Sequence, residues 1–475
     1  MSRVLMVASE ATPFAKTGGL ADVLGALPAA LNAAGDEVAV VMPRYRQIPY
    51  HATESAYDGL QLYAGRHAWK VDIRTLVRNG VRFYFVEHPH LFDRDGLYAQ
   101  RAFDYWDNHR RFAVLALAAL GVVETLFPAD VIHFHDWQAG LVPVYLKDQQ
   151  WNNPRFAGVK TVCTIHNLGY QGRFGKQVFP DLGLNEGWFR ADNLEFFGDV
   201  SFLKAGIVNA DWVTTVSPTY AREIQTPEGG FGFDGILRTR SASLSGILNG
   251  VDYSEWSPEV DPFIAAPYSA ENLEGKRACK LDLLREFNLP ADNPERPLIG
   301  IVSRFAHQKG FDLVAGVAQL FAEEDVQIVI LGSGEWKYEQ IFNEWQRWLP
   351  GKVGVWIGYN NKLAHKIEAG ADMFLMPSLY EPCGLNQIYS LRYGTVPVVR
   401  ATGGLADTIQ EDTGFRFWDY SVGALYDALR ASLGAYRNRE PWIERMRRCM
   451  AKDYSWDASA REYTDLYRKI TGRAG

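Results

Sequence analysis

The sequence predicts an α/β protein made of two Rossmann-like domains. At 475 residues the chain is longer than one hydrophobic core usually supports, which favours two domains. Between Arg3 and Met42 a strand pattern, a helical pattern and a second strand pattern follow one another. This βαβ order is typical of parallel, doubly wound sheets. A second series of the same kind begins at Leu298, so we expect two such domains that face each other.

The first βαβ unit can be predicted residue by residue. Arg3–Ala8 is a short apolar run and predicts a buried strand. Residues 20–31 carry apolar side chains at helical spacing, and Gly35 is placed to end that helix. Pro28 lies inside the pattern, so we expect it to kink the helix. Val38–Met42 predicts the second strand.

Three later strands of the first domain run directly into polar residues. The predicted strands are Asp130–Phe134, Thr161–Ile165 and Trp212–Val216. The polar residues that follow them are His135 and Asp136, His166 and Asn167, and Ser217. Because ligands bind outside the carboxyl ends of the strands in an open α/β sheet, we expect these side chains to converge on one crevice.

The second domain is predicted from a strand series that follows a proline-rich segment. Between Asn249 and Pro297 the periodic pattern weakens and six prolines accumulate, which indicates the connection between the domains. The predicted strands are Leu298–Val302, Gln327–Leu331, Val355–Ile357, Met373–Met376 and Val396–Val399. Helical patterns separate these strands, as in a parallel sheet.

Composition argues against several classes of protein. The formal net charge of −7 and the lack of a Lys/Arg-rich run argue against nucleic acid or an anionic membrane as a partner. The longest apolar run, residues 112–123, is too short to span a membrane and predicts a buried helix. The four cysteines are widely spaced and indicate neither a disulfide framework nor a zinc site. We therefore expect a soluble, cytoplasmic protein with reduced thiols.

Two segments carry the glycines and cations that suit a diphosphate. Residues 16–20 read Lys-Thr-Gly-Gly-Leu, in which the glycines allow close backbone approach, while Lys16 and the helix N-terminus favour an anion. Arg304 and Lys309 follow a predicted strand of the second domain. Fixed cations there stabilise the charge that develops on a departing diphosphate. In both cases the alternative is a surface loop whose charges are only solvated.

A third segment, residues 378–385, follows another predicted strand. It places Glu381 at the expected crevice, and Gly384 and Leu385 offer backbone N–H groups to a phosphate. His166 is a candidate to bind a sugar hydroxyl or the crevice backbone, with a structural histidine as the alternative. These residues suit a transferase that uses a sugar nucleotide.

Two kinds of short pattern leave alternatives open. Thr-Gly-Gly-Leu-Ala-Asp occurs at residues 17–22 and again at 402–407. The repeat either has a functional meaning or arises from chance and common glycine-rich turn chemistry. Two pairs resemble metal-binding patterns: His133 with His135, and Asp93 with Asp95. Each pair lacks further ligands nearby, so the sequence predicts no metal and no cofactor.

In their order along the chain, these motifs resemble those of bacterial glycogen synthases and plant starch synthases. The motifs are Lys16–Leu20, His135–Trp137, Thr164–Asn167, Leu248–Asp252, Ser303–Arg304 with Gln308–Gly310, and Glu381–Leu385. The resemblance extends to residues 453–457 and so covers nearly the whole chain. It implies a GT-B fold, with two domains across a deep cleft. It also implies retaining transfer of glucose from ADP-glucose to the non-reducing end of glycogen or a malto-oligosaccharide, with release of ADP.

The resemblance further implies roles for single residues. Glu381 would hold the donor glucose, the main-chain carbonyl of His166 would lie near the anomeric carbon, and Arg304 and Lys309 would neutralise the leaving group. The donor-binding residues would be Lys16, Gly18, Gly19, Tyr359, Cys383, Gly384 and Leu385. Donor glucose or acceptor would contact Tyr98, Asp136, Asn167 and Asn249. The domains would comprise residues 1–248 on the acceptor side, 249–455 for the nucleotide sugar, and 456–475 as a helix crossing back to the first domain.

Two departures from related enzymes accompany the resemblance. Related retaining GT-B enzymes often carry a second glutamate where this chain has Tyr389, as glycogen and starch synthases do, and Asn386 stands where many bacterial members have threonine. Three alternatives remain at this level: a glucosyltransferase with another acceptor, a glucan-binding scaffold, and a phosphorylase. A scaffold protein is expected to lose the charged residues of the cleft, whereas Lys16, Arg304, Lys309 and Glu381 are present here. A phosphorylase needs a lysine that binds pyridoxal phosphate, and no motif in the sequence indicates such a lysine. The sequence does not separate ADP-glucose from UDP-glucose.

Overall fold

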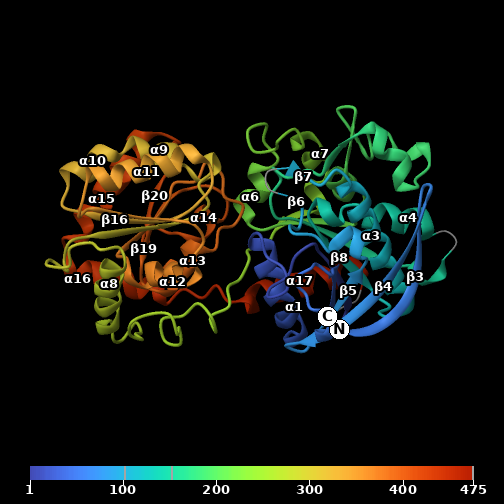
Figure 1. Ribbon diagram of the computed structural model, residues 1–475, viewed down its shortest axis with the longest axis horizontal. Coiled ribbons are helices and arrows are strands. Elements are labelled where there is room, and N and C mark those ends of the chain that lie inside the picture. The colour runs from blue at the N-terminus through green and yellow to red at the C-terminus, as the bar shows by residue number, and fades with distance from the viewer. Residues whose placement is uncertain (101–102, 151–152, 473–475) are drawn as a thin grey trace. The chain divides into compact units, whose positions relative to one another are not determined.

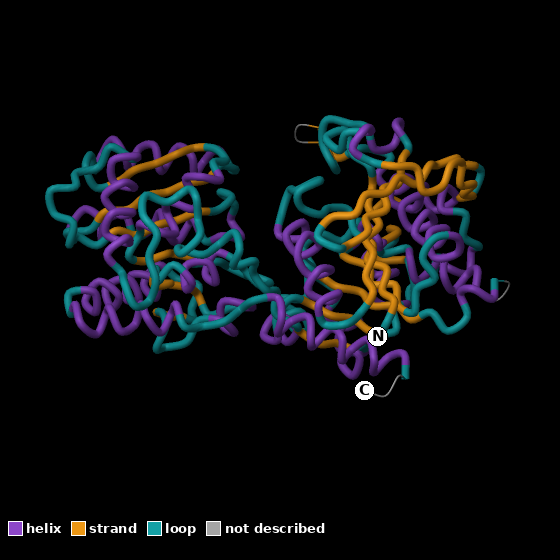
Figure 2. Tube along the Cα trace, turned by 90° about the horizontal axis from the view of Figure 1, so that it is seen from below, coloured by secondary structure: helices purple, strands orange, loops and turns teal. Residues whose placement is uncertain are grey.

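The computed structural model describes residues 1–100, 103–150 and 153–472, and the chain divides into two compact units (Figure 1). Unit 1 comprises Met1–Val216, Ala221–Gly250 and Trp456–Gly475. Unit 2 comprises Ser217–Tyr220 and Val251–Ser455. Figure 2, in which strands are orange, shows a separate sheet in each unit. The last helix of the chain therefore belongs to the same unit as the first strand.

Unit 1 is built around a nine-stranded sheet. In spatial order the strands are β14 (Leu244–Gly246), β13 (Trp212–Thr215), β9 (Lys160–Ile165), β8 (Val131–His135), β1 (Arg3–Val7), β2 (Glu37–Pro43), β5 (Val81–Glu87), β4 (His67–Arg78) and β3 (Glu54–Ala64). All pair in parallel except β4, which is antiparallel to β5 and β3. The five strands predicted for this half are present. Their carboxyl ends share one edge of the sheet, where the predicted polar residues lie.

The helices of unit 1 include one that the sequence assigned as buried. The helices are α1 (Gly19–Ala33), α2 (Pro89–Phe92), α3 (Asn108–Thr125), α4 (Val142–Gln150), α5 (Phe202–Asn209), α7 (Asp234–Thr239) and α17 (Trp456–Thr471), and α6 (Pro218–Glu223) spans the division between the units. Residues 112–123 of α3 are all buried, as predicted. Helix α1 continues through Pro28 to Ala33, and α17 packs against it. No helix among the described residues is long and apolar enough to cross a membrane.

Two small sheets lie outside the main sheet of unit 1. One pairs β6 (Ala99–Gln100) with β7 (Phe103–Asp104), and the other has the order β10 (Arg173–Gly175), β12 (Asp199–Ser201) and β11 (Glu195–Phe196). Strands β11 and β12 form a hairpin, because Phe196 pairs with Asp199 across a two-residue turn. None of these strands was predicted, since each has only two or three residues and no readable alternation.

Unit 2 is built around a six-stranded, wholly parallel sheet. In spatial order the strands are β17 (Val353–Ile357), β16 (Gln327–Gly332), β15 (Leu298–Val302), β18 (Met373–Met376), β19 (Val396–Arg400) and β20 (Phe415–Phe417). The side chains of β15 alternate between two cores: Ile299 and Ile301 pack into one, and Leu298 packs into the other. Both faces of this sheet are therefore covered, as the apolar strand sequences require.

Helices cover the two faces of the unit 2 sheet. They are α8 (Glu274–Glu286), α9 (Phe311–Gly316), α10 (Ala318–Glu323), α11 (Trp336–Trp348), α12 (Asn361–Gly370), α13 (Asn386–Arg392), α14 (Gly403–Thr408), α15 (Val422–Tyr436) and α16 (Arg439–Met450). Helices α9 and α11 lie on one side of the sheet, and α8 and α12 lie on the other (Figure 1). The polar edge of this sheet carries the loops that follow β15 and β18.

Residues 249–297, interpreted from the sequence as the connection between the domains, also build part of unit 2. Residues from Val251 onward belong to unit 2, and this stretch includes helix α8. Leu283 and Leu284 of α8 are fully buried against the sheet. The helix was missed because its apolar stripe is narrow and two lysines, Lys276 and Lys280, take buried places on it. Both lysines are hydrogen-bonded to unit 2 oxygens, which allows their burial.

Candidate functional site

In unit 1, the loop after β1 is organised by Glu10, a residue that the sequence reasoning missed. Its carboxylate is 3% exposed and accepts hydrogen bonds from the backbone N–H and the hydroxyl of Thr17 and from the hydroxyl of Tyr98. The Tyr98 hydroxyl also lies 2.7 Å from Oγ of Ser9. Burial and the neighbouring Glu10 raise the pKa of Tyr98, so this phenol stays neutral. Glu10 thus fixes the Lys-Thr-Gly-Gly loop and Tyr98 together.

The glycine loop itself leaves open space beside its backbone. A Cβ atom added at Gly18 or Gly19 would meet no atom within 4 Å. Gly19 is the first residue of the 15-residue helix α1. The unpaired backbone N–H groups of the first turn of this helix therefore point toward the loop. Lys16 is half exposed, and its ammonium lies 2.6 Å from a carboxylate oxygen of Asp22. The loop therefore has a cation and a helix N-terminus beside open space, and this combination favours the binding of an anion.

Polar contacts hold the three histidines in and directly after strands β8 and β9. His133 lies with Nδ1 2.7 Å from the hydroxyl of Tyr467 in α17 and Nε2 2.5 Å from Oγ1 of Thr164. Nδ1 of His135 lies 3.0 Å from Nε2 of His166. Burial lowers the pKa of His133 and His166 to about 3 and that of His135 well below its usual value, so all three rings are neutral.

The contact between His135 and His166 assigns their tautomers. Nε2 of His135 is buried and has no hydrogen-bond partner among the described residues. A buried N–H without an acceptor costs more than a buried lone pair, so we place the His135 proton on Nδ1. His135 then donates to Nε2 of His166, and the proton of His166 sits on Nδ1. This tautomer suits a histidine that binds a sugar hydroxyl.

Asp136 is held in an unusual backbone conformation at the same edge. Its φ of 56° lies in the left-handed region, which costs free energy for any residue but glycine. Its carboxylate is 9% exposed and accepts a hydrogen bond of 2.7 Å from the backbone N–H of His166. Burial raises the pKa of Asp136 to about 7, although the backbone hydrogen bonds of His166 and Asn167 act to lower it. The carboxylate and the His166 loop are thereby tied together.

The remaining predicted residues of unit 1 differ in their surroundings. Asn167 is partly exposed, and its side-chain oxygen accepts a hydrogen bond from Gly169, which shapes the loop after β9. Asn249 is 7% exposed and lies in the last segment of unit 1 before the chain enters unit 2. The unit 1 residues brought into direct contact are those around Glu10 and those around Asp136.

In unit 2, the loops after β15 and β18 meet through an ion pair. Nζ of Lys309 lies 2.6 Å from Oε2 of Glu381, and the side chains are 18% and 6% exposed. Ser378 donates a hydrogen bond of 3.0 Å to the same carboxylate oxygen. The loops are also joined by backbone bonds, with Leu379 N–H donating to the carbonyl of Gln308. Two sequence-predicted catalytic residues, Lys309 and Glu381, are therefore in contact, as neighbouring parallel strands permit.

Gly310 explains how the Lys309 loop approaches β18 so closely. Its φ is 75°, and an added Cβ would lie 2.0 Å from the carbonyl oxygen of Pro377. Only glycine satisfies both conditions without a shift of the backbone. Arg304 and Tyr359 are exposed at the same edge, Tyr359 by 82%. Within the described part of the chain no ion pair involves Arg304.

The backbone of the segment Glu381–Leu385 packs closely against the second Thr-Gly-Gly sequence. A Cβ added at Gly403 would lie 1.9 Å from the Glu381 carbonyl oxygen, and one at Gly404 would lie 2.1 Å from that of Cys383. Cys383 is buried, and Gly384, with a φ of 73°, turns the chain toward Leu385 at the start of α13. The two copies of the motif therefore differ: the first faces open space, and the second packs beneath the Glu381 loop.

The two residues at which the sequence departs from related enzymes have structural roles. Tyr389 is 8% exposed, and its ring stacks on Trp256 at 4.0 Å, which in turn stacks on His365 at 3.7 Å. Asn386 donates a hydrogen bond of 2.8 Å to the carbonyl of Val302, the last residue of β15. Asn386 thus links α13 to the strand that leads to Arg304.

The residues that resemble metal sites are occupied by other partners. Arg46 pairs with both Asp93 and Asp95, and His133 is held by Tyr467 and Thr164. Among the described residues, no group of three or more His, Cys, Asp or Glu side chains could hold a metal ion. These pairs are therefore explained by packing and charge balance.

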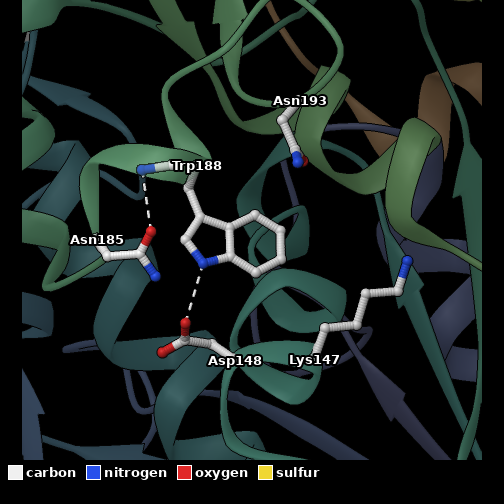
Figure 3. A pocket seen from close by; sticks show the side chains of 6 residues that line it. Lys147, Asp148, Asn185, Trp188 and Asn193 are labelled. Carbon is white, nitrogen blue, oxygen red and sulfur yellow. Dashed lines mark hydrogen bonds between the residues drawn. The ribbon is translucent and has the colours of Figure 1, made fainter.

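A pocket of about 340 Å³ also opens on unit 1 (Figure 3). Its lining residues are Lys147, Asp148, Asn185, Gly187, Trp188 and Asn193. The indole N–H of Trp188 donates to Asp148 at 2.9 Å, which fixes the ring in the pocket wall. None of the predicted site residues lines this pocket.

Comparison with known proteins places the chain in a family. Residues 3–239 match the family model of the starch synthase catalytic domain, and residues 285–448 match that of group 1 glycosyl transferases. A glycogen synthase of Koribacter versatilis (strain Ellin345) is 48% identical over 474 residues, with 98% of each chain covered. One of Anaeromyxobacter dehalogenans (strain 2CP-1 / ATCC BAA-258) is 51% identical over 478 residues, covering 98% of this chain and 99% of the relative. The chain belongs to the glycogen and starch synthase family.

Solved structures agree with this family assignment. The catalytic domain of starch synthase IV from Arabidopsis thaliana, bound to ADP and acarbose, superposes with a TM-score of 0.90 at 31% identity. The match covers 99% of this chain and all of that one. A sucrose-phosphate synthase from Thermosynechococcus elongatus superposes with a TM-score of 0.63 at 19% identity over the full chains, which shows a shared fold alone. The fold is the GT-B fold of glycosyltransferases, as the sequence motifs implied.

Proposed function

We propose that this protein transfers glucose from ADP-glucose to the non-reducing end of an α-1,4-glucan, with retention of the anomeric configuration and release of ADP. The observation that carries the proposal is the contact of Lys309 with Glu381 at the carboxyl ends of β15 and β18. It places a cation and a carboxylate together at the edge where an open α/β sheet binds its ligand. Relatives that match 98% of the chain are named glycogen synthases, and the solved starch synthase holds ADP.

On the donor side, the charges of unit 2 suit a sugar diphosphate. Lys309 and the exposed Arg304 neutralise the diphosphate as the glycosidic bond breaks, because negative charge grows on its oxygens in the transition state. Glu381 accepts hydrogen bonds from hydroxyl groups of the donor glucose. The backbone N–H groups of Gly384 and Leu385 bind phosphate oxygens beside Cys383, and the exposed ring of Tyr359 lies against the base.

Unit 1 supplies the remaining donor contacts and the acceptor contacts. Lys16, Gly18 and Gly19 bind the diphosphate at the N-terminus of α1, where the backbone is open to a ligand. The carbonyl of His166 lies near the anomeric carbon, and its Nδ1–H binds a sugar hydroxyl. The glucose or the acceptor contacts Tyr98, Asp136, Asn167 and Asn249. Tyr98 and Asp136 are held in place by Glu10 and by the backbone of His166, respectively.

The transfer step needs no covalent intermediate on the protein. The bond from the anomeric carbon to the diphosphate oxygen breaks, and its electron pair leaves with ADP. The 4-hydroxyl of the acceptor forms the new bond on the same face of the sugar. Its proton passes to the departing diphosphate oxygen, which acts as the base. The neighbouring cations stabilise the charge until that proton arrives.

The test is glucose transfer measured with ADP-glucose and UDP-glucose in parallel, with glycogen as acceptor and EDTA present. We expect ADP release that matches chain elongation, a product digestible as α-1,4-glucan, and a much lower rate with UDP-glucose. Elongation that prefers UDP-glucose would correct the donor, and glycogen binding without transfer from either donor would overturn the proposal. Loss of activity in EDTA would show that a metal is required after all.

The setting of the reaction forms part of the same proposal. The four cysteines are buried thiols that form no disulfide, which suits a reducing compartment, and we place the enzyme in the cytosol. Its partners there are ADP-glucose and glycogen or malto-oligosaccharides.

A further inference from the structure

Two phenylalanines of unit 1 occupy backbone positions that disfavour them. Phe197 has a φ of 51° and Phe231 a φ of 48°, and each is followed by a glycine with a positive φ, Gly198 at 85° and Gly232 at 84°. Both phenylalanine side chains are exposed, by 77% and 40% respectively. Bulky side chains are rare in the left-handed region because Cβ approaches the carbonyl oxygen.

The first of these positions is the turn of the β11–β12 hairpin. Phe196 pairs with Asp199, so Phe197 and Gly198 are the two turn residues. Positive φ at both positions is the type I′ pattern, for which Asn-Gly is the preferred sequence. A phenylalanine there strains the backbone and also exposes an apolar ring to water. Neither cost is offset by burial of that ring in the fold, and strain of this kind concentrates at functional sites.

The two exposed rings lie on neighbouring loops. Phe196 packs against Phe197 with ring centroids 4.6 Å apart and stacks on Phe233 at 4.4 Å. The position of a Cβ on Gly232 lies 3.7 Å from the ring of Phe197, so the loop that carries Phe231 runs beside that ring. A buried layer of Phe196 and Phe233 therefore carries an exposed layer of Phe197 and Phe231, which we call the phenylalanine ledge.

The ledge is continuous with the loop that carries His166 and Asn167. Gln171, in that loop, donates from its side-chain amide to the carbonyl of Phe231 at 3.0 Å. Tyr170, between Asn167 and Gln171, is 54% exposed. Further along, the carbonyl of Gln171 accepts a hydrogen bond from Ser201 at the end of β12. The loop from His166 to Gln171 therefore connects the predicted glucose-binding residues to the ledge, and it carries the exposed ring of Tyr170.

We propose that the phenylalanine ledge binds a segment of the α-1,4-glucan acceptor, several glucose units from the end that receives glucose. Glucose rings have apolar C–H faces that stack on aromatic rings, and several exposed rings on neighbouring loops suit a chain of such units. This inference rests on the proposed function for the identity of the ligand. It adds a distal subsite that makes long acceptors better substrates than short ones.

The test exploits the backbone strain, because asparagine suits both turns better than phenylalanine. Phe197→Asn, Phe231→Asn and the double variant are compared with the wild type by thermal unfolding, affinity electrophoresis in glycogen, and KM for glycogen against KM for maltotriose. We expect Tm to stay level or rise while retardation by glycogen weakens. We also expect the ratio of KM for glycogen to KM for maltotriose to rise about two- to tenfold for each ring removed. If the rings had a purely structural role, glycogen binding would weaken only in variants whose Tm also falls.

Tyr63→Thr is the matched control, because Tyr63 is a 71% exposed aromatic of unit 1 that lies in strand β3 at an ordinary backbone position. It should leave both the KM ratio and the retardation by glycogen at wild-type values. If the double variant shows unchanged retardation by glycogen and an unchanged KM ratio, the proposal that the ledge binds glucan is wrong. Glycogen retardation does not depend on glucose transfer, so a wild-type protein that binds glycogen through the ledge but transfers no glucose would contradict only the proposed function.

Discussion

Nζ of Lys309 lies 2.6 Å from Oε2 of Glu381, although 72 residues separate them in the chain. The contact arises because β15 and β18 are neighbours in the sheet, so the loops after them share one edge. Glu381 is almost completely buried, and its carboxylate also accepts a hydrogen bond from Ser378. Each partner thus fixes the other before any substrate binds, which is the preorganisation that electrostatic catalysis requires.

Removing the cation should slow the reaction far more than it weakens acceptor binding. In Lys309→Ala the diphosphate loses a fixed positive charge that acts in the transition state, and we expect kcat to fall about 10²- to 10³-fold. Retardation by glycogen should stay near the wild-type value, because the acceptor residues lie in unit 1. The measurements are steady-state kinetics with ADP-glucose and affinity electrophoresis. Equal losses in kcat and glycogen binding would contradict a role confined to the leaving group.

Replacing the carboxylate tests the other half of the pair. Glu381→Gln keeps the size of the side chain and can still accept a hydrogen bond from Ser378, so the fold should stay intact. The neutral amide no longer pairs with Lys309, and we expect most of the turnover to be lost. Circular dichroism and thermal unfolding check the fold, and initial rates check turnover. Wild-type rates in this variant would remove Glu381 from the site.

The two Thr-Gly-Gly sequences allow a matched comparison of glycines. Gly19→Ala places a methyl group in open space at the start of α1, so Tm should stay level or rise slightly while KM for ADP-glucose increases. Gly404→Ala drives Cβ against the Cys383 carbonyl, and overpacking of this kind costs about 1–3 kcal/mol. We therefore expect a Tm lowered by a few degrees for Gly404→Ala alone. A fall in Tm for Gly19→Ala would mean that this loop is packed and not open.

The order of strands and helices could be predicted because buried parallel strands have strongly apolar sequences. Met373–Met376 and Leu298–Val302 were placed with the bounds that the structure shows. The antiparallel strands β3 and β4 were missed, since Glu54–Ala64 is mostly exposed and carries little apolar signal. Helix α8 was missed for a related reason, because lysines occupy two of its buried positions.

The candidate site was predictable where a residue follows a strand, and not where its role depends on a distant partner. Lys309 and Glu381 were found from their positions after strands, and the structure brings them together. Glu10 follows β1 as well, but its role depends on Thr17 and Tyr98, and only the fold reveals those contacts. Tyr467, 334 residues from His133, could not be paired with it by any local pattern.

Asp136 should make the stability of the protein depend on pH in a characteristic direction. Burial raises its pKa to about 7, above the value of about 4 in an unfolded chain. Between these values the folded state holds a proton that the unfolded state lacks, so this residue's contribution to stability falls as pH rises from 4 through 7. Asp136→Asn removes the titration, and the amide oxygen of asparagine can still accept the hydrogen bond from the backbone N–H of His166.

The neutral, buried His133 and His166 act in the opposite direction, because they resist protonation that the unfolded chain accepts below about pH 6.5. Both histidines are present in the variant and the wild type, so their effect cancels in the difference between the two. We expect the Tm of Asp136→Asn, relative to the wild type, to be higher at pH 8 than at pH 5, as measured by calorimetry at fixed ionic strength. A difference that is constant across this range would show that Asp136 titrates normally, and that its carboxylate is solvated in the folded protein.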